Sequence, residues 1–281
     1  MDQPILRLEN ACVRFGDRTL WSGLDLELSA GELVAVLGPN GAGKTTLMRA
    51  ILGVQPLTEG RIELLGEPVR RGHPAIGYLP QQRFADRSIP IRARDLVALS
   101  CQGTRFGFPL PDRSVRRRVD DALAATGVSH LATAPVGILS GGEQQRVRIA
   151  QALVSEPRLL LCDEPLSALD LPNQQAVSQL IDDSRKTGDR AALMITHDIN
   201  PVLGAVDRVI YLAGGRALVG PVDEVLRTDV LTRLYGSPVE VLRVRGRIVV
   251  VGVPEDPHGH LAADDHHPDA DAEALVKGAA Q

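Results

Sequence analysis

The segment "ELVAVLGPNGAGKTTLMRAIL" at 32–52 runs from a short apolar stretch through a glycine-rich loop into a helical pattern. This order, with the spacing Gly-x4-Gly-Lys-Thr at 38–45, is the context of a phosphate-binding loop. The glycines let several backbone N–H groups point at a phosphate, and the positive N-terminal end of the helix strengthens the attraction. Lys44 can bridge the β- and γ-phosphates of a nucleotide, and the Thr45 hydroxyl can ligate Mg²⁺. The segment therefore predicts a nucleotide site at the end of a buried strand.

Three further apolar runs, at 76–80, 158–165 and 191–198, are separated by segments with a helical pattern. Continuous apolar runs of this length are typical of parallel strands that are covered on both faces. Strands that are joined through helices imply right-handed crossovers and an open, doubly wound sheet. The expected fold class is therefore α/β.

Other regions have different patterns. The first 30 residues contain shorter, alternating apolar stretches, which predict an antiparallel β layer. Residues 239–253 predict a terminal hairpin that turns at Arg245-Gly246. We expect four units along the chain: a core part with the β layer at 1–87, a helical subdomain at 88–156, the rest of the core at 157–253, and a disordered His/Asp-rich tail at 254–281.

The composition narrows the class of partner. Of the 35 acidic and 31 basic residues, seven acids and one base fall within 254–281, so the rest of the chain is close to neutral. A near-neutral body gives little electrostatic reason to expect nucleic-acid binding. The basic run "DRSVRRRVDD" at 112–121 is flanked by acids and predicts an exposed helix that starts at Asp112.

Cysteine usage and the apolar runs suggest where the chain works. Cys12, Cys101 and Cys162 have no metal-ligand spacing and are typical of a reduced, cytosolic protein. The opening "MDQPILRLEN" lacks the pattern of a signal peptide. No apolar run approaches the roughly 20 residues needed to span a bilayer, so any role at a membrane would depend on a partner.

Two adjacent carboxylates follow another apolar run. In "LLLCDEP" at 159–165, Asp163 and Glu164 come at the end of a predicted strand, where ligands bind in open α/β sheets. Strand alternation would send the two side chains in different directions. Asp163 fits the shell of a Mg²⁺ ion, and Glu164 fits a base or water-orienting group for hydrolysis.

The string "LSGGEQQR" at 139–146 predicts a helix start with a second function. Ser140 can cap the helix, and Glu143 can close a capping box with it. The Ser-Gly-Gly turn can also expose N–H groups and a hydroxyl as a small anion cradle. Both can hold together, and a second cradle implies a nucleotide that is gripped from two sides.

Over residues 5–235 the chain resembles the ATP-binding subunits of ABC transporters. The resemblance rests on six strings in the family's order: "GPNGAGKT", "LPQ" at 79–81, "LSGGEQQR", "LLLCDEP", "SALD" at 167–170 and "ITHD" at 195–198. It implies a RecA-like, mostly parallel sheet core with an antiparallel β layer and a helical subdomain. It also implies ATP and Mg²⁺ as cofactors, and a head-to-tail homodimer. Each ATP would lie between the phosphate loop of one chain and the Ser-Gly-Gly loop of the other.

The resemblance also assigns roles to single residues. Gln81 would sense Mg²⁺ and the attacking water and couple to the membrane partner, Asp170 would link the two sites of the dimer, and His197 would contact the γ-phosphate. Phe15 would stack on adenine, where the family often has tyrosine. The implied sites are, for ATP, Phe15, Gly38, Pro39, Asn40, Gly41, Ala42, Gly43, Lys44, Thr45 and Thr46; for Mg²⁺, Thr45, Gln81 and Asp163; for catalysis, Gln81, Glu164 and His197; and for the opposite subunit's ATP, Ser140, Gly141, Gly142, Glu143 and Gln144.

Finer resemblance indicates a prokaryotic importer of a divalent metal (Zn²⁺, Mn²⁺ or Fe²⁺). Residues 76–100, "THDINPVL" and "VDRVIYLAGGRALVGPVDEVL" are similar to segments of zinc and manganese importers. Such a system would hold two copies of the chain on the cytoplasmic face of the plasma membrane, against integral-membrane permease subunits. An extracytoplasmic metal-binding protein would deliver the ion to the permease. An importer of iron siderophores or haem is the alternative. An ABC ATPase that acts on nucleic acid is disfavoured by the single set of motifs without coiled coils or cysteine clusters.

The stretch "PHGHLAADDHHPD" at 257–269 holds four of the seven histidines, His258, His260, His266 and His267. Two interpretations stay open. The segment is a solvated acidic tail with incidental histidines, or its imidazoles wrap around Zn²⁺ or a similar ion as a weak buffering or sensing site. Ordering it would cost roughly 1–2 kcal/mol of backbone entropy per residue, which limits the affinity.

Overall fold

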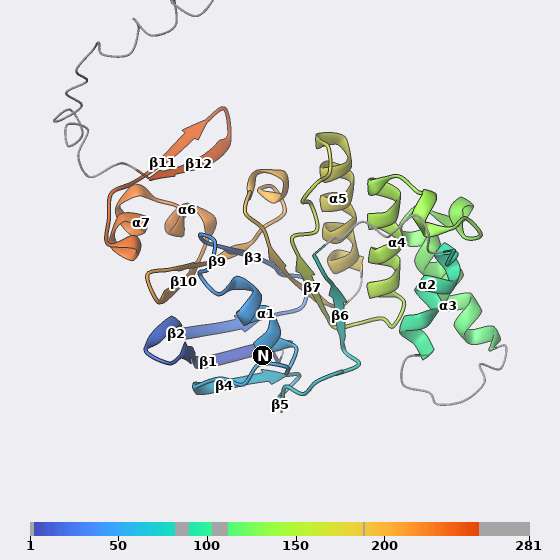
Figure 1. The fold of residues 1–281 in the computed structure, drawn as a ribbon, viewed down its shortest axis with the longest axis horizontal. Coiled ribbons are helices and arrows are strands. Elements are labelled where there is room, and N and C mark those ends of the chain that lie inside the picture. The colour runs from blue at the N-terminus through green and yellow to red at the C-terminus, as the bar shows by residue number, and fades with distance from the viewer. Residues whose placement is uncertain (1–2, 82–89, 103–111, 188, 253–281) are drawn as a thin grey trace, which may run out of the picture.

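The computed structural model describes residues 3–81, 90–102, 112–187 and 189–252. Its central feature is a six-stranded sheet in the order β10-β9-β3-β8-β7-β6 (Figure 1). All its strands run parallel except β10, which pairs antiparallel with β9 at one edge. The predicted α/β sheet is confirmed. The strands are β3 (Leu33–Leu37), β6 (Ile76–Leu79), β7 (Leu159–Asp163), β8 (Ala191–Ile195), β9 (Arg208–Ala213) and β10 (Arg216–Gly220).

The central strands β3, β8 and β7 are buried at every position. Their sequences show no alternation because both faces of the sheet are covered. Parallel strands bring their carboxyl ends to one edge of the sheet, so the segments that follow β3, β6, β7 and β8 meet there. The phosphate loop, Gln81, Glu164 and His197 follow these four strands.

A four-stranded antiparallel sheet in the order β2-β1-β4-β5 forms the predicted β layer. The layer extends beyond the first 30 residues, because β4 and β5 also belong to it. Helix α1 packs between this layer and the main sheet, and its Leu47 shares a buried cluster with Trp21 of β2 and Val36 of β3. These elements are β1 (Leu6–Phe15), β2 (Arg18–Leu28), β4 (Glu59–Leu64), β5 (Glu67–Pro68) and α1 (Lys44–Ile51).

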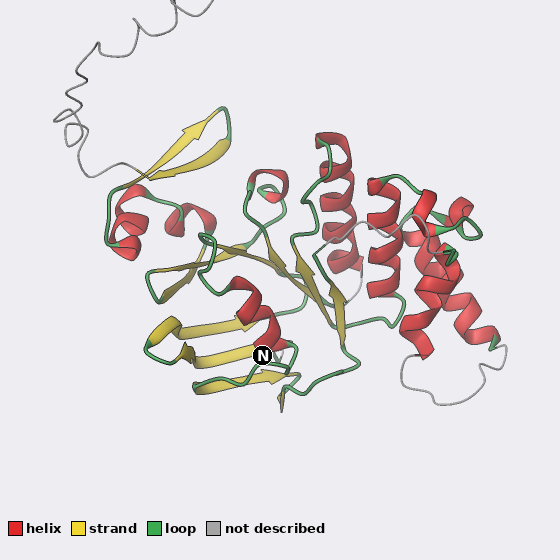
Figure 2. Cartoon of the chain, in the orientation of Figure 1, coloured by secondary structure: helices red, strands yellow, loops and turns green. Residues whose placement is uncertain are grey.

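Helices and the C-terminal segment cover the opposite face of the main sheet (Figure 2). Residues of β3 alternate between the two cores: Val34 and Val36 pack toward α1, whereas Ala35 and Leu37 pack toward this second face. Full burial of one aliphatic side chain stabilises a fold by about 1.5–3 kcal/mol, so the sheet is anchored from both sides. The helices on this face are α5 (Leu171–Thr187), α6 (Val222–Val225) and α7 (Thr228–Tyr235).

Helices α2 (Ala93–Gln102), α3 (Arg113–Ala125) and α4 (Gly141–Leu153) lie beside the β6 edge and share a core of their own. The helix predicted in the basic run is confirmed as α3. Its N-cap is Asp112, whose carboxylate accepts a hydrogen bond from the Ser114 N–H at 2.8 Å. The limits 88–156 of a helical subdomain stay a prediction.

Strands β11 (Val239–Val244) and β12 (Arg247–Gly252) form the predicted C-terminal hairpin. Its turn falls at Arg245 and Gly246, whose φ values of 49° and 76° are those of a two-residue hairpin turn. The predicted tail at 254–281 lies outside the described residues. Within the part of the chain that the structure describes, no helix has the length and apolarity to cross a membrane.

Candidate nucleotide-binding site

The loop predicted to bind phosphate connects β3 to α1, which begins at Lys44. Its surroundings require glycine at two positions. Gly38 has a φ of 138°, and a Cβ there would overlap the carbonyl oxygen of Leu212. Gly43 has a φ of 94°, and a Cβ there would lie 2.9 Å from the Trp21 ring. The loop is thus held against β9 and β2, and the N–H groups at the start of α1 are the donors for an anion.

The Lys44 side chain folds back over this loop. Its Nζ donates to the carbonyl oxygens of Gly38 at 2.8 Å and Pro39 at 3.0 Å. Burial lowers the pKa of the amine, and the carboxylates of Glu164 and Asp163 oppose that shift. An ammonium has three N–H donors, so one remains for a phosphate oxygen. Lys44 is therefore placed where a phosphate in the loop would meet a positive charge.

Asp163, the predicted Mg²⁺ ligand, ends β7 and is buried. Burial raises the pKa of its carboxyl, and the neighbouring Glu164 carboxylate raises it further. The hydroxyl of Tyr78, in β6, donates a hydrogen bond to Asp163 that partly opposes this shift. No sequence pattern had indicated Tyr78. A buried carboxylate beside another carboxylate favours a cation, which would offset the cost of burying the negative charge.

Gln81 and His197 meet at Glu164. Its carboxylate accepts a hydrogen bond from Gln81 Nε2 at 2.8 Å, and Nδ1 of His197 lies 3.9 Å from the same oxygen. Glu164 has a φ of 50°, so the backbone turns out of β7 here, where strand alternation had been expected. A left-handed non-glycine residue is strained by about 1–3 kcal/mol, and such strain is concentrated at functional sites.

Ser140 and Glu143 form the predicted capping box at the start of α4. The Glu143 carboxylate accepts from the Ser140 N–H at 2.8 Å and from its hydroxyl at 2.7 Å, and these bonds lower the pKa of Glu143. We call residues 140–144 the signature loop. Because α4 packs beside β6 while α1 follows the central β3, the two anion cradles come from different parts of the chain (Figure 1).

The signature loop is fixed to the segment that follows β7. Gln145 is fully buried, and its Nε2 donates to the carbonyl oxygen of Pro165 at 2.8 Å. Asn173 of α5 donates from Nδ2 to Oδ1 of Asp170 at 2.7 Å. A Cβ on Gly142 would lie 2.7 Å from Cγ of Asn173, so the loop packs directly on this amide. Sequence patterns had given roles to Gly142 and Asp170 but not to Gln145 or Asn173.

Phe15, the residue expected to stack on adenine, is the last residue of β1 and is half exposed. It pairs across the turn with Arg18, whose guanidinium donates to the carbonyl oxygen of Gly41 at 3.1 Å. The turn that carries Phe15 is therefore attached to the phosphate loop. An exposed aromatic ring at this place can stack on a base.

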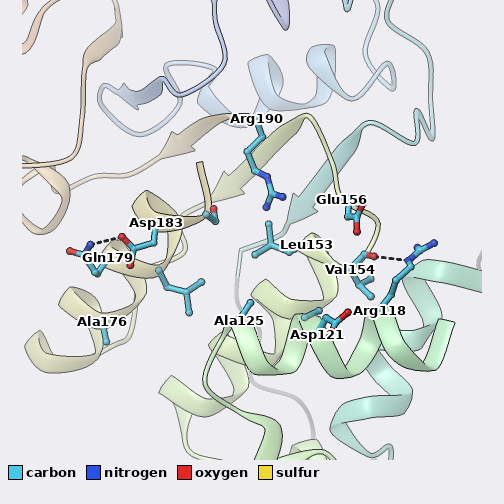
Figure 3. A pocket seen from close by; sticks show the side chains of 13 residues that line it. Arg118, Asp121, Ala125, Leu153, Val154, Glu156, Ala176, Gln179, Asp183 and Arg190 are labelled. Carbon is cyan, nitrogen blue, oxygen red and sulfur yellow. Dashed lines mark hydrogen bonds between the residues drawn. The ribbon is translucent and has the colours of Figure 1, made fainter. Parts of the chain in front are cut away.

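Two of the cavities in the described part of the chain differ in how they relate to the nucleotide residues. One, of about 700 Å³, is lined by the phosphate loop at Gly38 and Pro39, the segment at 197–200 and residues of β12. The other, of about 580 Å³, lies among α3, α4 and α5, and Arg190 reaches into it (Figure 3). None of the predicted nucleotide residues lines this second cavity. Within the described ranges no group of three or more histidine, cysteine, aspartate or glutamate side chains is arranged to hold a metal ion, and the four tail histidines fall outside those ranges.

Comparisons with known proteins identify the family of the chain. Residues 21–167 match the model of the ABC transporter family. The chain is 35% identical over 235 residues to the zinc import ATP-binding protein ZnuC of Magnetococcus marinus, with 84% of each chain covered. It is 37% identical over 237 residues to the protein of that name from Chelativorans sp., covering 84% of this chain and 78% of the relative. A solved structure described as an inward-facing metal-chelate type ABC transporter matches with a TM-score of 0.74 at 28% identity, covering 90% of this chain and 98% of that one.

Proposed function

The chain belongs to the ABC transporter family and is an ATP-hydrolysing subunit, and from this premise we propose that it powers the import of a divalent metal ion, with Zn²⁺ as the first candidate. The observation that best supports ATP hydrolysis is the position of the Glu164 carboxylate, which lies between Gln81 and His197 at the strand ends beside the phosphate loop. The relatives named for zinc import support the choice of substrate.

The donor set fits a nucleotide with Mg²⁺. Asp163 offers a buried carboxylate with a raised pKa, and the Thr45 hydroxyl belongs to the first turn of α1, so both ligands are the hard oxygens that Mg²⁺ prefers. Asp163 and Thr45 would hold Mg²⁺, which would supply positive charge to offset the negative charge of the phosphates. The loop N–H groups and Lys44 hold the phosphates, and Phe15 holds the base.

Hydrolysis then rests on three side chains. Glu164 orients a water molecule toward the γ-phosphate and accepts its proton. Gln81 holds the Glu164 carboxylate through its amide, and His197, which is largely exposed, is free to donate to a γ-phosphate oxygen. Lys44 and Asp163 are buried, so their charges are less screened by water and their electrostatic contacts with a bound nucleotide would be stronger.

The signature loop serves the ATP of a second copy of the chain. Its capped helix start offers N–H groups and the Ser140 hydroxyl to a phosphate. Two such chains, joined head to tail, work at the cytoplasmic face of the membrane against permease subunits, and an extracytoplasmic metal-binding protein delivers the ion. ATP closes the dimer and hydrolysis reopens it, which moves the permease.

Import of an iron siderophore or haem is the second candidate. It is favoured by the structural relative described as metal-chelate type, which matches over 90% of this chain. The ion or chelate does not touch the ATPase subunit in either case, so the nucleotide site alone does not distinguish them.

Reconstitution with the permease and binding protein distinguishes the candidates. Zn²⁺ loaded on the binding protein is expected to stimulate ATPase activity in proteoliposomes, whereas a ferric siderophore and haem are not. The same vesicles with Glu164→Gln give the background rate. Stimulation by a siderophore or haem alone would overturn metal-ion import, and stimulation by nucleic acid instead would overturn transport.

A further inference from the structure

A single side chain ties the segment that carries His197 to the C-terminal hairpin. Asn200 begins the short 3-10 helix Asn200–Val202 and faces β12. Its Oδ1 accepts a hydrogen bond from the Ile248 N–H at 2.8 Å, and its Nδ2 donates to the Ile248 carbonyl oxygen at 2.9 Å. The amide thus pairs with Ile248 as a neighbouring strand would, along the edge of β12 that β11 does not occupy.

The hydrogen bonds continue from Asn200 toward His197. The carboxylate of Asp198 accepts from the Asn200 N–H at 2.9 Å and from Nδ2 at 2.7 Å. The Thr196 hydroxyl donates to the Asp198 carbonyl oxygen at 2.7 Å and accepts from the Asp198 N–H at 3.2 Å. His197 lies between Thr196 and Asp198, so its backbone is fixed on both sides by a network that ends on β12.

All the polar atoms of the Asn200 amide are used. Its two N–H groups go to Asp198 and Ile248, and its oxygen accepts from Ile248. The hairpin depends on such contacts, because a two-stranded hairpin alone is at best marginally stable in water. Its outer face is exposed at Leu242 and Val249, and only one face packs on the core, through Val239 and Ile248.

We propose that Asn200 is a positioning residue, through which the β11–β12 hairpin controls the placement of His197. The inference rests on the role proposed for His197 at the γ-phosphate. We therefore expect that loss of the contact between Asn200 and the hairpin lowers the rate of ATP hydrolysis. The affinity for ATP should not change, because the phosphate loop and Lys44 are held by other contacts.

The test compares ATPase kinetics of the full chain with changes on each side of the contact. Asn200→Ala removes both bonds to Ile248 and the Nδ2 bond to Asp198, and Ile248→Pro removes the N–H from the β12 edge together with a buried side chain. Asn200→Ala is expected to lower kcat roughly tenfold, as the loss of two ordinary hydrogen bonds that hold a catalytic group would do, and Ile248→Pro, which removes one of the two, about threefold. The dissociation constant of ATP is expected to change by less than about twofold, because the bonds that are removed do not hold the phosphate loop or Lys44. A twofold change corresponds to less free energy than the loss of one such bond.

A matched control and a conservative variant sharpen the test. Val250→Pro changes the same edge of β12 two residues further along and is expected to keep kcat. Asn200→Asp is nearly isosteric but replaces both donors by a charge beside Asp198, so it is expected to lower kcat at least as much as Asn200→Ala.

His197→Ala separates the inference from the role on which it rests. If His197→Ala hydrolyses ATP normally, the proposed role of His197 fails, and the inference fails with it. If His197→Ala is inactive while the Asn200 variants keep full kcat, only the inference fails. Equal loss in Val250→Pro and Ile248→Pro, or a parallel loss of ATP affinity and thermal stability in Asn200→Ala, would also overturn it.

Discussion

Replacement of Gly142 by alanine adds one methyl group and is expected to disturb both the signature loop and the segment around Asp170, which Asn173 joins to it. Gly142 lies in the first turn of α4, where alanine alone would favour the helix by about 1 kcal/mol over glycine. The added Cβ would, however, overlap Oδ1 of Asn173 and lie 2.7 Å from its Cγ. Asn173 does not turn aside freely, because its Nδ2 and its backbone N–H both donate to Asp170 Oδ1, at 2.7 Å and 3.0 Å.

The magnitude depends on which group gives way. If Asn173 moves, a hydrogen bond from its amide to a carboxylate is lost, which is worth about 1.5–3 kcal/mol. If it stays, the overpacked contact costs about 1–3 kcal/mol. A cost of about 2 kcal/mol in the active arrangement corresponds to a fall in turnover of about thirtyfold.

A double-mutant cycle isolates this cause. Asn173→Ala removes the three atoms that the new Cβ would meet, so Gly142→Ala should cost much less in that background than in the natural chain. Steady-state ATPase rates of the four proteins complete the cycle, and thermal unfolding checks that each is folded. Equal losses in both backgrounds would refute the reasoning and would place the damage at the nucleotide rather than at Asn173.

Three further outcomes are expected. Glu164→Gln should keep ATP binding and slow turnover by about 10²–10⁴-fold, trapping an ATP-bound dimer visible by size-exclusion chromatography; near-normal hydrolysis would contradict its role. Ser140→Arg and Lys44→Ala should each abolish hydrolysis, yet recover part of it when mixed, because one composite site then has both halves intact. Inactive mixtures with proven mixed dimers would argue against head-to-tail sharing. Truncation after Pro254 should leave basal ATPase unchanged and remove weak Zn²⁺ binding in calorimetry, which should fade below a pH of about 6.5 because imidazole ligands must be neutral. Equal zinc binding by both chains, or none by the intact chain, would leave the tail without a metal role.

Features that a few neighbouring residues determine could be predicted from the sequence. The phosphate loop needs Gly38 and Gly43 at a fixed spacing before a helix, and the capping box needs only Ser140 and Glu143. The hairpin turn at Arg245-Gly246 is likewise local. Central strands could be recognised because burial on both faces leaves a continuous apolar run.

Contacts between distant segments could not be predicted in this way. The hydrogen bond from Tyr78 to Asp163 exists because β6 pairs with β7, and the sequence of neither strand indicates which strand it pairs with. Asn200 lies 48 residues before Ile248, and its partner is a backbone edge that carries no sequence signal. The turn at Glu164 was missed because an apolar run does not reveal where its strand ends.

The contacts around Gln145 and Asn173 join parts of two different sites. Within one chain, Gln145 ties α4 to Pro165, directly after Glu164, and Asn173 ties Gly142 to Asp170. In the proposed dimer, Glu164 serves the chain's own ATP, whereas the signature loop serves the ATP of the opposite subunit. If the start of α4 moved away from the segment that follows Glu164, the Pro165 carbonyl oxygen and the fully buried Gln145 amide would lose their hydrogen bond. We therefore expect the two segments to move together. In the proposed dimer a displacement at one ATP would therefore be carried to the other, and the two sites are expected to respond to ATP as a pair.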